Sequence, residues 1–187
     1  MRNRSLLILS ILSIAATSLA AQGVNPPISP AAATPQWRSF LSANPLGIPF
    51  DIVSVEAETA ISGGGTIGAV GSYNDINHTR YQTFDAQFKY YPGEVAMQGF
   101  SVGMSAGYTK FNVSVPPNGT GTEPHGQLNA STLGVLVDYN WNQGPSQRFV
   151  IGTGVGAKRI LASSARRDAL GLDRAYVTGR FVIGLLF

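Results

Sequence analysis

The sequence has no cysteine and only two histidines, His78 and His125, so no disulfide can form and a zinc site is not expected. Charged residues make up only 12% of the chain, about half the usual share. Beyond the N-terminus, no apolar run approaches the ~18 residues that a transmembrane helix needs. A chain with so little charge and no such helix can be apolar overall if its apolar residues are spread over alternating strands.

Glycine, by contrast, is abundant, with 22 of 187 residues, which disfavours long helices and suits tightly curved sheets. The net charge of +3 does not indicate nucleic-acid binding. Removing Arg2 and Arg4 with an expected leader leaves 11 of the 13 basic residues, against 10 acidic ones. The one basic cluster, Arg166 and Arg167, stands beside Asp168 and is interpreted as a solvated loop.

Residues 1–20 have the three parts of a secretory signal peptide. Two arginines precede an apolar stretch, and the small residues Ser18 and Ala20 stand at the −3 and −1 positions of a cut before Ala21. Residues 21–35 then contain four prolines and several alanines, which predicts an extended periplasmic linker. The sequence therefore predicts an exported protein with a folded domain over residues 36–187.

From residue 36 onward the dominant sequence period is two, the pattern of strands with two different faces. In residues 100–111, for example, large apolar side chains alternate with serine, glycine and threonine. Eight strands are predicted in this way, at 36–43, 51–61, 66–73, 83–91, 100–111, 133–141, 149–158 and 176–187. The first is the weakest pattern, because WRSFLSA could also begin a short helix.

The predicted connections nearly alternate in length. They are long at 115–129 and 161–173, short at 92–98 and 142–147, tight at 62–65 and intermediate at 74–80. Transmembrane barrels have this pattern, with long loops outside and short turns on the periplasmic side. An even strand number places both chain ends in the periplasm, which supports the strand at 36–43. The predicted fold is all-β, an eight-stranded antiparallel up-and-down transmembrane β-barrel.

The two faces of the predicted strands differ in a way that places the polar face inside. That face is crowded with small residues and carries charges of both signs, which fits a narrow lumen. Its charged members form the predicted lumen network: Glu56, Glu58, Asp85, Lys89, Asp138, Arg148, Lys158 and Arg180. These charges should pair across neighbouring strands and close the lumen to ions, with inward glycines leaving space for Arg148, Lys158 and Arg180. Aromatic residues near the strand ends of the other face suit the two interfaces of a bilayer.

Three segments resemble a known family, the small eight-stranded outer-membrane barrels of the OmpA, OmpX and OmpW group. They are the opening WRSFLSANPLGIPF, the middle FKYYPGEVAMQGFSVGMSAGY and the closing GRFVIGLLF. The resemblance implies residence in the outer membrane, contact with its lipid, and a surface role in which the long loops meet an extracellular ligand. It also implies recognition by the barrel-assembly machinery through a C-terminal signal, here Phe181, Ile183, Leu185 and Phe187.

The sequence is also compatible with other functions. A narrow pore or a carrier of small apolar molecules is the main alternative, and a soluble carrier with its apolar face inside is a third. A lipid A-modifying enzyme would use a serine, a histidine and an acid, for which His125, Glu123 and Ser131 are candidates. Pro124 and Gly126 flank that histidine without providing rigid positioning, so no catalytic residue is predicted. The glycine-rich stretch 152–158 lacks the ending of a phosphate loop, and no cofactor is expected.

Overall fold

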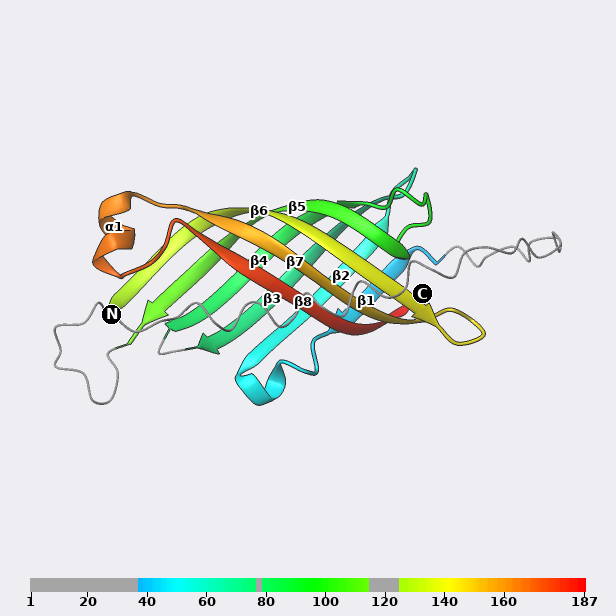
Figure 1. The fold of residues 1–187 in the computed structure, drawn as a ribbon, viewed down its shortest axis with the longest axis horizontal. Coiled ribbons are helices and arrows are strands. Elements are labelled where there is room, and N and C mark those ends of the chain that lie inside the picture. The colour runs from blue at the N-terminus through cyan, green and yellow to red at the C-terminus, as the bar shows by residue number, and fades with distance from the viewer. Residues whose placement is uncertain (1–36, 77–78, 115–124) are drawn as a thin grey trace, which may run out of the picture. The chain divides into compact units, whose positions relative to one another are not determined.

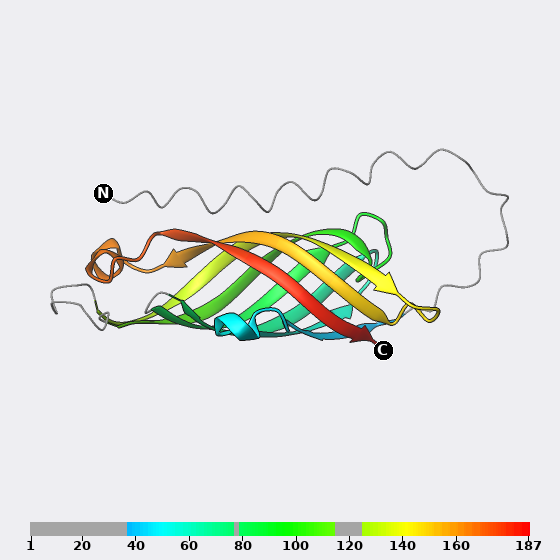
Figure 2. The same cartoon turned by 60° about the horizontal axis from the view of Figure 1, so that its bottom comes forward.

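The computed structural model describes residues 37–76, 79–114 and 125–187, and these form one closed β-barrel (Figures 1 and 2). Its strands are β1 (Ser39–Ala43), β2 (Ile52–Ala60), β3 (Gly65–Ile76), β4 (Thr79–Tyr90), β5 (Gly99–Val113), β6 (Gly126–Gln143), β7 (Phe149–Leu161) and β8 (Ala175–Leu186). All neighbours are antiparallel and follow the sequence order, and β8 pairs with β1. The predicted eight-stranded up-and-down barrel is confirmed.

Two short helices lie in the connections: η1 (Ile48–Phe50) follows β1, and α1 (Ser164–Ala169) follows β7. Within the described residues, no helix has both the length and the apolar character needed to cross a membrane. The predicted signal peptide 1–20, the predicted linker 21–35 and Glu123 lie outside the described residues.

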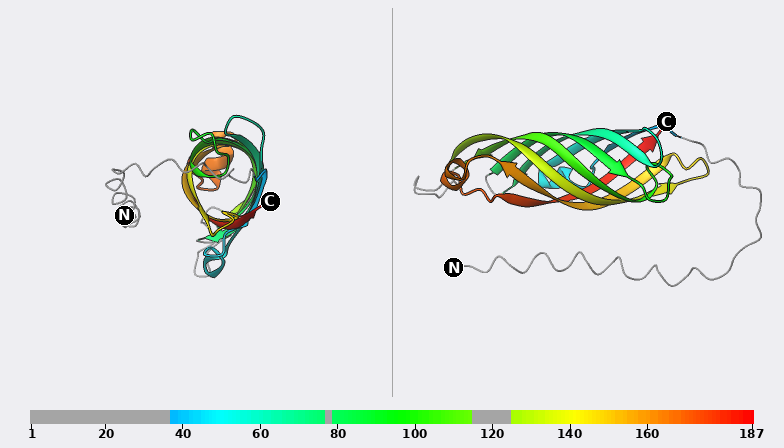
Figure 3. Two further views of the ribbon diagram at one scale, coloured as in Figure 1. Left: turned by 90° about the vertical axis from the view of Figure 1, so that its right-hand side faces the viewer. Right: turned by 90° about the horizontal axis from the view of Figure 1, so that it is seen from above.

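The connections give the barrel two different ends. We call the end with residues 61–64, 91–98 and 144–148, where β8 finishes, the turn end. At the opposite end, which we call the loop end, the connections 44–51 and 162–174 follow β1 and β7, β3 and β5 finish, and β4 and β6 begin. Viewed along the barrel axis, the sheet closes into a ring, and α1 lies over the loop end (Figure 3).

The strands extend further toward the loop end than the sequence predicted. β3 and β4 pair as far as Ile76 and Thr79, so the expected loop at 74–80 is mostly strand. β6 begins at Gly126, inside the loop expected at 115–129. Polar residues such as Asn74 and Asp75 occupy both faces of these extensions, so the hydrophobic alternation stops although the hydrogen-bonded ladder continues. The lengths of the connections therefore alternate less regularly than predicted.

The wall of the barrel is apolar outside and polar inside. Outward Phe84 is 65% exposed and outward Val177 is 80% exposed. The inward Asp85, Lys89 and Asp138 are each at most 2% exposed. A soluble barrel has the reverse distribution, because water drives its apolar face inward. The prediction that the apolar face points outward is therefore confirmed.

Aromatic side chains ring the outward face near the turn end. Six of them are 40–58% exposed: Tyr90, Phe100, Tyr139, Trp141, Phe149 and Phe187. The aromatic residues nearer the loop end, Phe84 and Tyr108, make a sparser second group. Rings at this position suit a membrane interface, where one edge of the side chain meets polar headgroups and the other meets acyl chains.

One side of the wall is short. β1 has five residues, whereas a strand that crosses a bilayer needs about 9–11. Its residues 40–43 pair with residues 183–186 of β8, and the ladder ends there. The connection 44–51 follows at this point and exposes the apolar side chains of Leu46, Ile48 and Phe50.

The short β1 leaves part of β8 without a neighbour on that side. The amide of Phe187 donates to the Ser39 carbonyl, so every second residue of β8 directs its backbone polar groups toward β1. By this alternation the backbone groups of Ala175, Val177, Gly179 and Phe181 face a stretch where no described strand pairs with them. We call this stretch the β8 seam.

Phe187 closes the barrel with its backbone and shows its ring to the outside. Its N–H donates to Ser39 O at 2.9 Å, and its carbonyl accepts from Ser39 N at 2.9 Å and Arg38 N at 3.2 Å. We expect deletion of Phe187 to lower the folded fraction in cells and on refolding in detergent, because these hydrogen bonds are lost. Phe187→Ala keeps these backbone hydrogen bonds but removes the ring from the predicted assembly signal. It should therefore lower the folded yield in cells and leave refolding in detergent unchanged.

The heat-modifiable fraction on gels measures both effects. Membrane samples report the folded fraction in cells, and samples refolded from urea report the folded fraction on refolding. Phe149→Ala is the control, because Phe149 is an outward aromatic opposite Leu185 at the same end of the barrel but not at the C-terminus. Unchanged folded yields for both Phe187 variants would contradict the role given to this residue.

Candidate functional site

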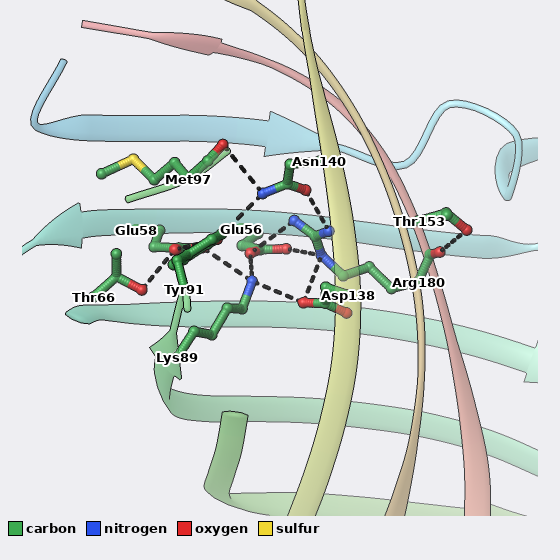
Figure 4. A network of polar contacts seen from close by, with 10 residues as sticks. All are labelled: Glu56, Glu58, Thr66, Lys89, Tyr91, Met97, Asp138, Asn140, Thr153 and Arg180. Atoms are coloured by element: carbon green, nitrogen blue, oxygen red, sulfur yellow. Dashed lines mark hydrogen bonds and ion pairs between the residues drawn. The ribbon is translucent and has the colours of Figure 1, made fainter. Parts of the chain in front are cut away.

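The lumen holds a cluster of charged side chains centred on Lys89 of β4 (Figure 4). The Lys89 Nζ lies 2.5 Å from Glu56 Oε1 and 3.0 Å from Glu58 Oε2, both on β2. It lies 3.2 Å from Asp138 Oδ2 on β6. All four side chains are at most 5% exposed, and burying any of these charges without a partner would cost several kcal/mol. The three carboxylates therefore hold the ammonium group at the centre of the lumen.

Arg180 of β8 joins the same cluster from the other side of the lumen. Its Nε donates to Glu56 Oε2 at 2.8 Å and its Nη2 donates to Glu56 Oε1 at 3.1 Å, which is a bidentate pair. The Arg180 Nε also lies 3.7 Å from Asp138 Oδ2. Glu56 thus contacts both cations, and Asp138 lies beside both.

We call Glu56, Glu58, Lys89, Asp138 and Arg180 the lumen network. It contains three acids and two bases, so one negative charge has no cation of its own. Two hydroxyl donors offset that excess at Glu58 Oε1: Thr66 donates at 2.6 Å and Tyr91 at 2.8 Å.

Asn140 links the hydroxyl donors back to the cations. Its Nδ2 donates to the Tyr91 hydroxyl at 3.2 Å, and its Oδ1 accepts from Arg180 Nη1 at 3.0 Å. Thr66, Tyr91 and Asn140 were not among the lumen residues predicted from the sequence. The period of two could have found the last two, because Tyr91 follows Lys89 by two residues and Asn140 follows Asp138 by two.

A second pair, Lys158 of β7 with Asp85 of β4, lies apart from the lumen network. Pairing across neighbouring strands was expected, and this was wrong. Among the described residues, each ion pair inside the lumen joins strands that are not neighbours: β2 with β4 or β8, β6 with β4 or β8, and β4 with β7. The interior of an eight-stranded barrel is narrow enough for long side chains to meet across it.

Glycine occupies the positions directly opposite most of these charges. The cross-strand pairs are Glu58 with Gly68, Lys89 with Gly103, Asp85 with Gly107, Lys158 with Gly134, and both Asp138 and Arg180 with Gly154. A Cβ on Gly103 would lie 3.0 Å from Lys89 Cγ, and one on Gly134 would lie 2.9 Å from Lys158 Cγ. A Cβ on Gly152 would lie 2.7 Å from Arg180 Nη1, so the expectation that inward glycines make room for long charged side chains is confirmed for Lys158 and Arg180.

Apolar layers lie on both sides of the charged layer. At the turn end, the buried side chains are Phe40, Met97, Val150, Val182 and Leu186. At the loop end, they are Phe111, Leu128, Ala130 and Ile160, and Leu170 and Leu172 from the connection after α1 pack against them. Charged side chains alone were expected to fill the lumen, whereas the structure adds an apolar layer at each end.

Arg148 does not join the lumen network, which corrects its assignment. It lies in the turn before β7, where its Nε donates to Leu186 O at 3.1 Å and its guanidinium lies 4.8 Å from the Trp37 ring centre. The Trp37 indole donates to Ser146 O at 3.3 Å. Arg148 therefore fastens the turn end, because the strand that would carry it inward begins only at Phe149.

The remaining sequence candidates are described except for Glu123, which lies outside the described residues. Residues 152–158 lie within β7, as expected for a strand and not for a phosphate loop. His125 is exposed just before β6, and Ser131 is exposed on the outward face of β6. Within the described residues, no group of three or more potential ligands could hold a metal ion. The four residues of the predicted assembly signal all lie on the outward face of β8 or directly after it.

Comparisons with known protein families, with curated proteins and with solved structures found no match to this chain. The established class is therefore the one that the fold defines, a closed eight-stranded antiparallel β-barrel with a charged layer in its lumen.

Replacing the central cation tests the energetic role of the lumen network. Lys89→Met leaves Glu56, Glu58 and Asp138 around a neutral side chain, so we expect a loss of about 3–5 kcal/mol in the free energy of unfolding. Lys110→Met makes the same chemical change at an exposed position and should stay within about 0.5 kcal/mol of wild type. Urea unfolding in detergent or vesicles measures both, and equal stabilities of the two variants would contradict the buried network.

Proposed function

We propose that this protein is an integral outer-membrane β-barrel with a structural or surface-interaction role and a closed lumen. The observation that carries this proposal is the reversed polarity of the wall, with apolar side chains outside and charges inside. In water such a surface would be a large aggregation-prone patch, whereas in lipid it is the expected exterior. A closed sheet also pairs backbone groups that lipid cannot solvate.

The resemblance to the OmpA, OmpX and OmpW group supports the same proposal. Export by a signal peptide at residues 1–20 and a C-terminal signal ending at Phe187 fit assembly from the periplasmic side. The turn end would then face the periplasm, and the loop end would face outward. The surface role would belong to the loop end, because loops on a rigid scaffold can vary without disturbing the barrel.

The lumen arrangement supports a barrel that does not conduct. The charged layer fills the middle of the lumen with paired side chains, and each end carries an apolar layer. An ion would have to displace paired groups and also pass two apolar layers, both of which are costly.

One observation favours a second candidate, a carrier of small apolar molecules. The β8 seam leaves backbone groups without a described strand partner, and the connection after the short β1 exposes Leu46, Ile48 and Phe50. Because no described strand pairs with β8 along this seam, the strands there can separate at lower cost than in a fully paired sheet. Such an opening would give an apolar molecule lateral access to the barrel.

Fractionation tests the proposed location. Expressed with residues 1–20 in a Gram-negative host, the protein should begin at Ala21, sediment with the outer membrane and shift on gels between unheated and boiled samples. Soluble monomer in the periplasm would contradict the proposal.

Planar-bilayer recording tests the closed lumen. The purified folded protein should give no stable conductance steps, because the charged layer and both apolar layers block the lumen. Reproducible steps would support a pore instead. Saturable binding of a fluorescent fatty acid, with no conductance, would favour the carrier.

A further inference from the structure

The loop end carries a cavity of about 510 Å³ between the end of β7, α1 and the start of β8. Its lining includes three arginines, Arg159, Arg167 and Arg174, and two serines, Ser163 and Ser164. No acidic side chain lines this cavity. Across the part of the chain that the structure describes, none of these three arginines forms an ion pair. We call this feature the arginine cavity.

The local structure fixes the backbone at all three arginines and holds the side chain of Arg167. Arg159 belongs to β7 and stands opposite Ala175. The Arg174 carbonyl accepts from the Ile160 amide at 2.9 Å, which ties the start of β8 to the end of β7. The Arg167 amide donates to Ser163 O at 3.2 Å, and its Nε donates to Ala162 O at 3.4 Å. The cavity thus has a basic lining, in which Arg167 is half-buried and Arg159 and Arg174 are exposed.

We propose that the arginine cavity binds the phosphate group of an outer-leaflet lipid. Three guanidinium groups around one cavity repel one another unless an anion lies between them. Phosphate suits that role because its oxygens accept paired, charge-assisted hydrogen bonds from the planar guanidinium fork. The hydroxyls of Ser163 and Ser164 add donors of the kind that a phosphate also accepts.

The position of Arg159 assigns the phosphate to a lipid. On the outward face of β7, Arg159 follows Val155 and Ala157, so it stands where the apolar wall gives way to charge. A lipid whose acyl chains cover that wall would bring its headgroup to the arginine cavity. This inference rests on the proposed membrane location, because only there does lipid cover the wall.

The test uses the mature folded chain in vesicles of phosphatidylcholine, with or without a minor fraction of phosphatidic acid. Flotation in phosphatidylcholine alone is measured first. Native mass spectrometry of detergent-extracted protein then counts retained phosphatidic acid. The cavity variant carries Arg159→Gln, Arg167→Gln and Arg174→Gln. A matched control carries Arg38→Gln, Lys110→Gln and Arg166→Gln, which removes three positive charges outside the cavity.

We expect wild type and control to retain phosphatidic acid and the cavity variant to retain at least about tenfold less. Inorganic phosphate should not displace the lipid. Equal retention by the two variants would overturn the site, since general surface charge would then explain the binding. Displacement by inorganic phosphate would overturn the lipid assignment. A protein that fails to float in phosphatidylcholine overturns the proposed function and this inference with it, whereas one that floats without preference overturns this inference alone.

Discussion

The barrel depends on the burial of charge inside a lumen barely wide enough for side chains. Among the described residues, seven charged side chains lie in that lumen, and each has an opposite charge within reach: Glu56, Glu58, Asp85, Lys89, Asp138, Lys158 and Arg180. They have room because glycine stands directly opposite six of them, Glu56 being the exception with Val70 and Ser42 as neighbours. The abundance of glycine is therefore a packing requirement of the charged layer as well as of the curved sheet.

The same arrangement explains why the outside can be apolar. Once the polar groups pair inward, period-two alternation leaves large apolar side chains on the other face of every strand. The six aromatics at the turn end and the charges around the loop end then bound an apolar belt. Two places differ from the rest of this belt: the β8 seam lacks a described strand partner, and the arginine cavity is basic. Both adjoin β8.

Much of this arrangement could be predicted from the sequence. Alternation predicted seven of the strands, and the need for an even strand number supported the eighth, β1, from a weak pattern at WRSFLSA. Alternation also assigned seven lumen charges to the inward face, but it could not say which acid meets which base. The pairing depends on strand register and on the distances across the lumen. As a result, Lys158 pairs with Asp85 although their strands are not neighbours.

Three features of the structure could not be predicted from the sequence. Arg148 follows the parity of β7 but precedes its first residue, so the turn directs it to Trp37. The apolar layers combine strand residues, such as Val150 and Ile160, with residues of the connections, such as Met97 and Leu170, that follow no strand period. The β8 seam depends on where the ladder between β1 and β8 stops, which is a property of two segments far apart in the sequence.

The central claim is that the outward face of the barrel contacts lipid. Because the chain has no cysteine, single cysteines can be placed on the outward face of β5, at Phe100, Val102, Met104, Ala106 and Tyr108, and spin-labelled. In vesicles, the collision rate of the spin label with oxygen, relative to its collision rate with an aqueous nickel chelate, should be highest near the middle of this series. It should fall toward both ends. Equally high collision rates of the spin label with the nickel chelate at all five positions would contradict the account.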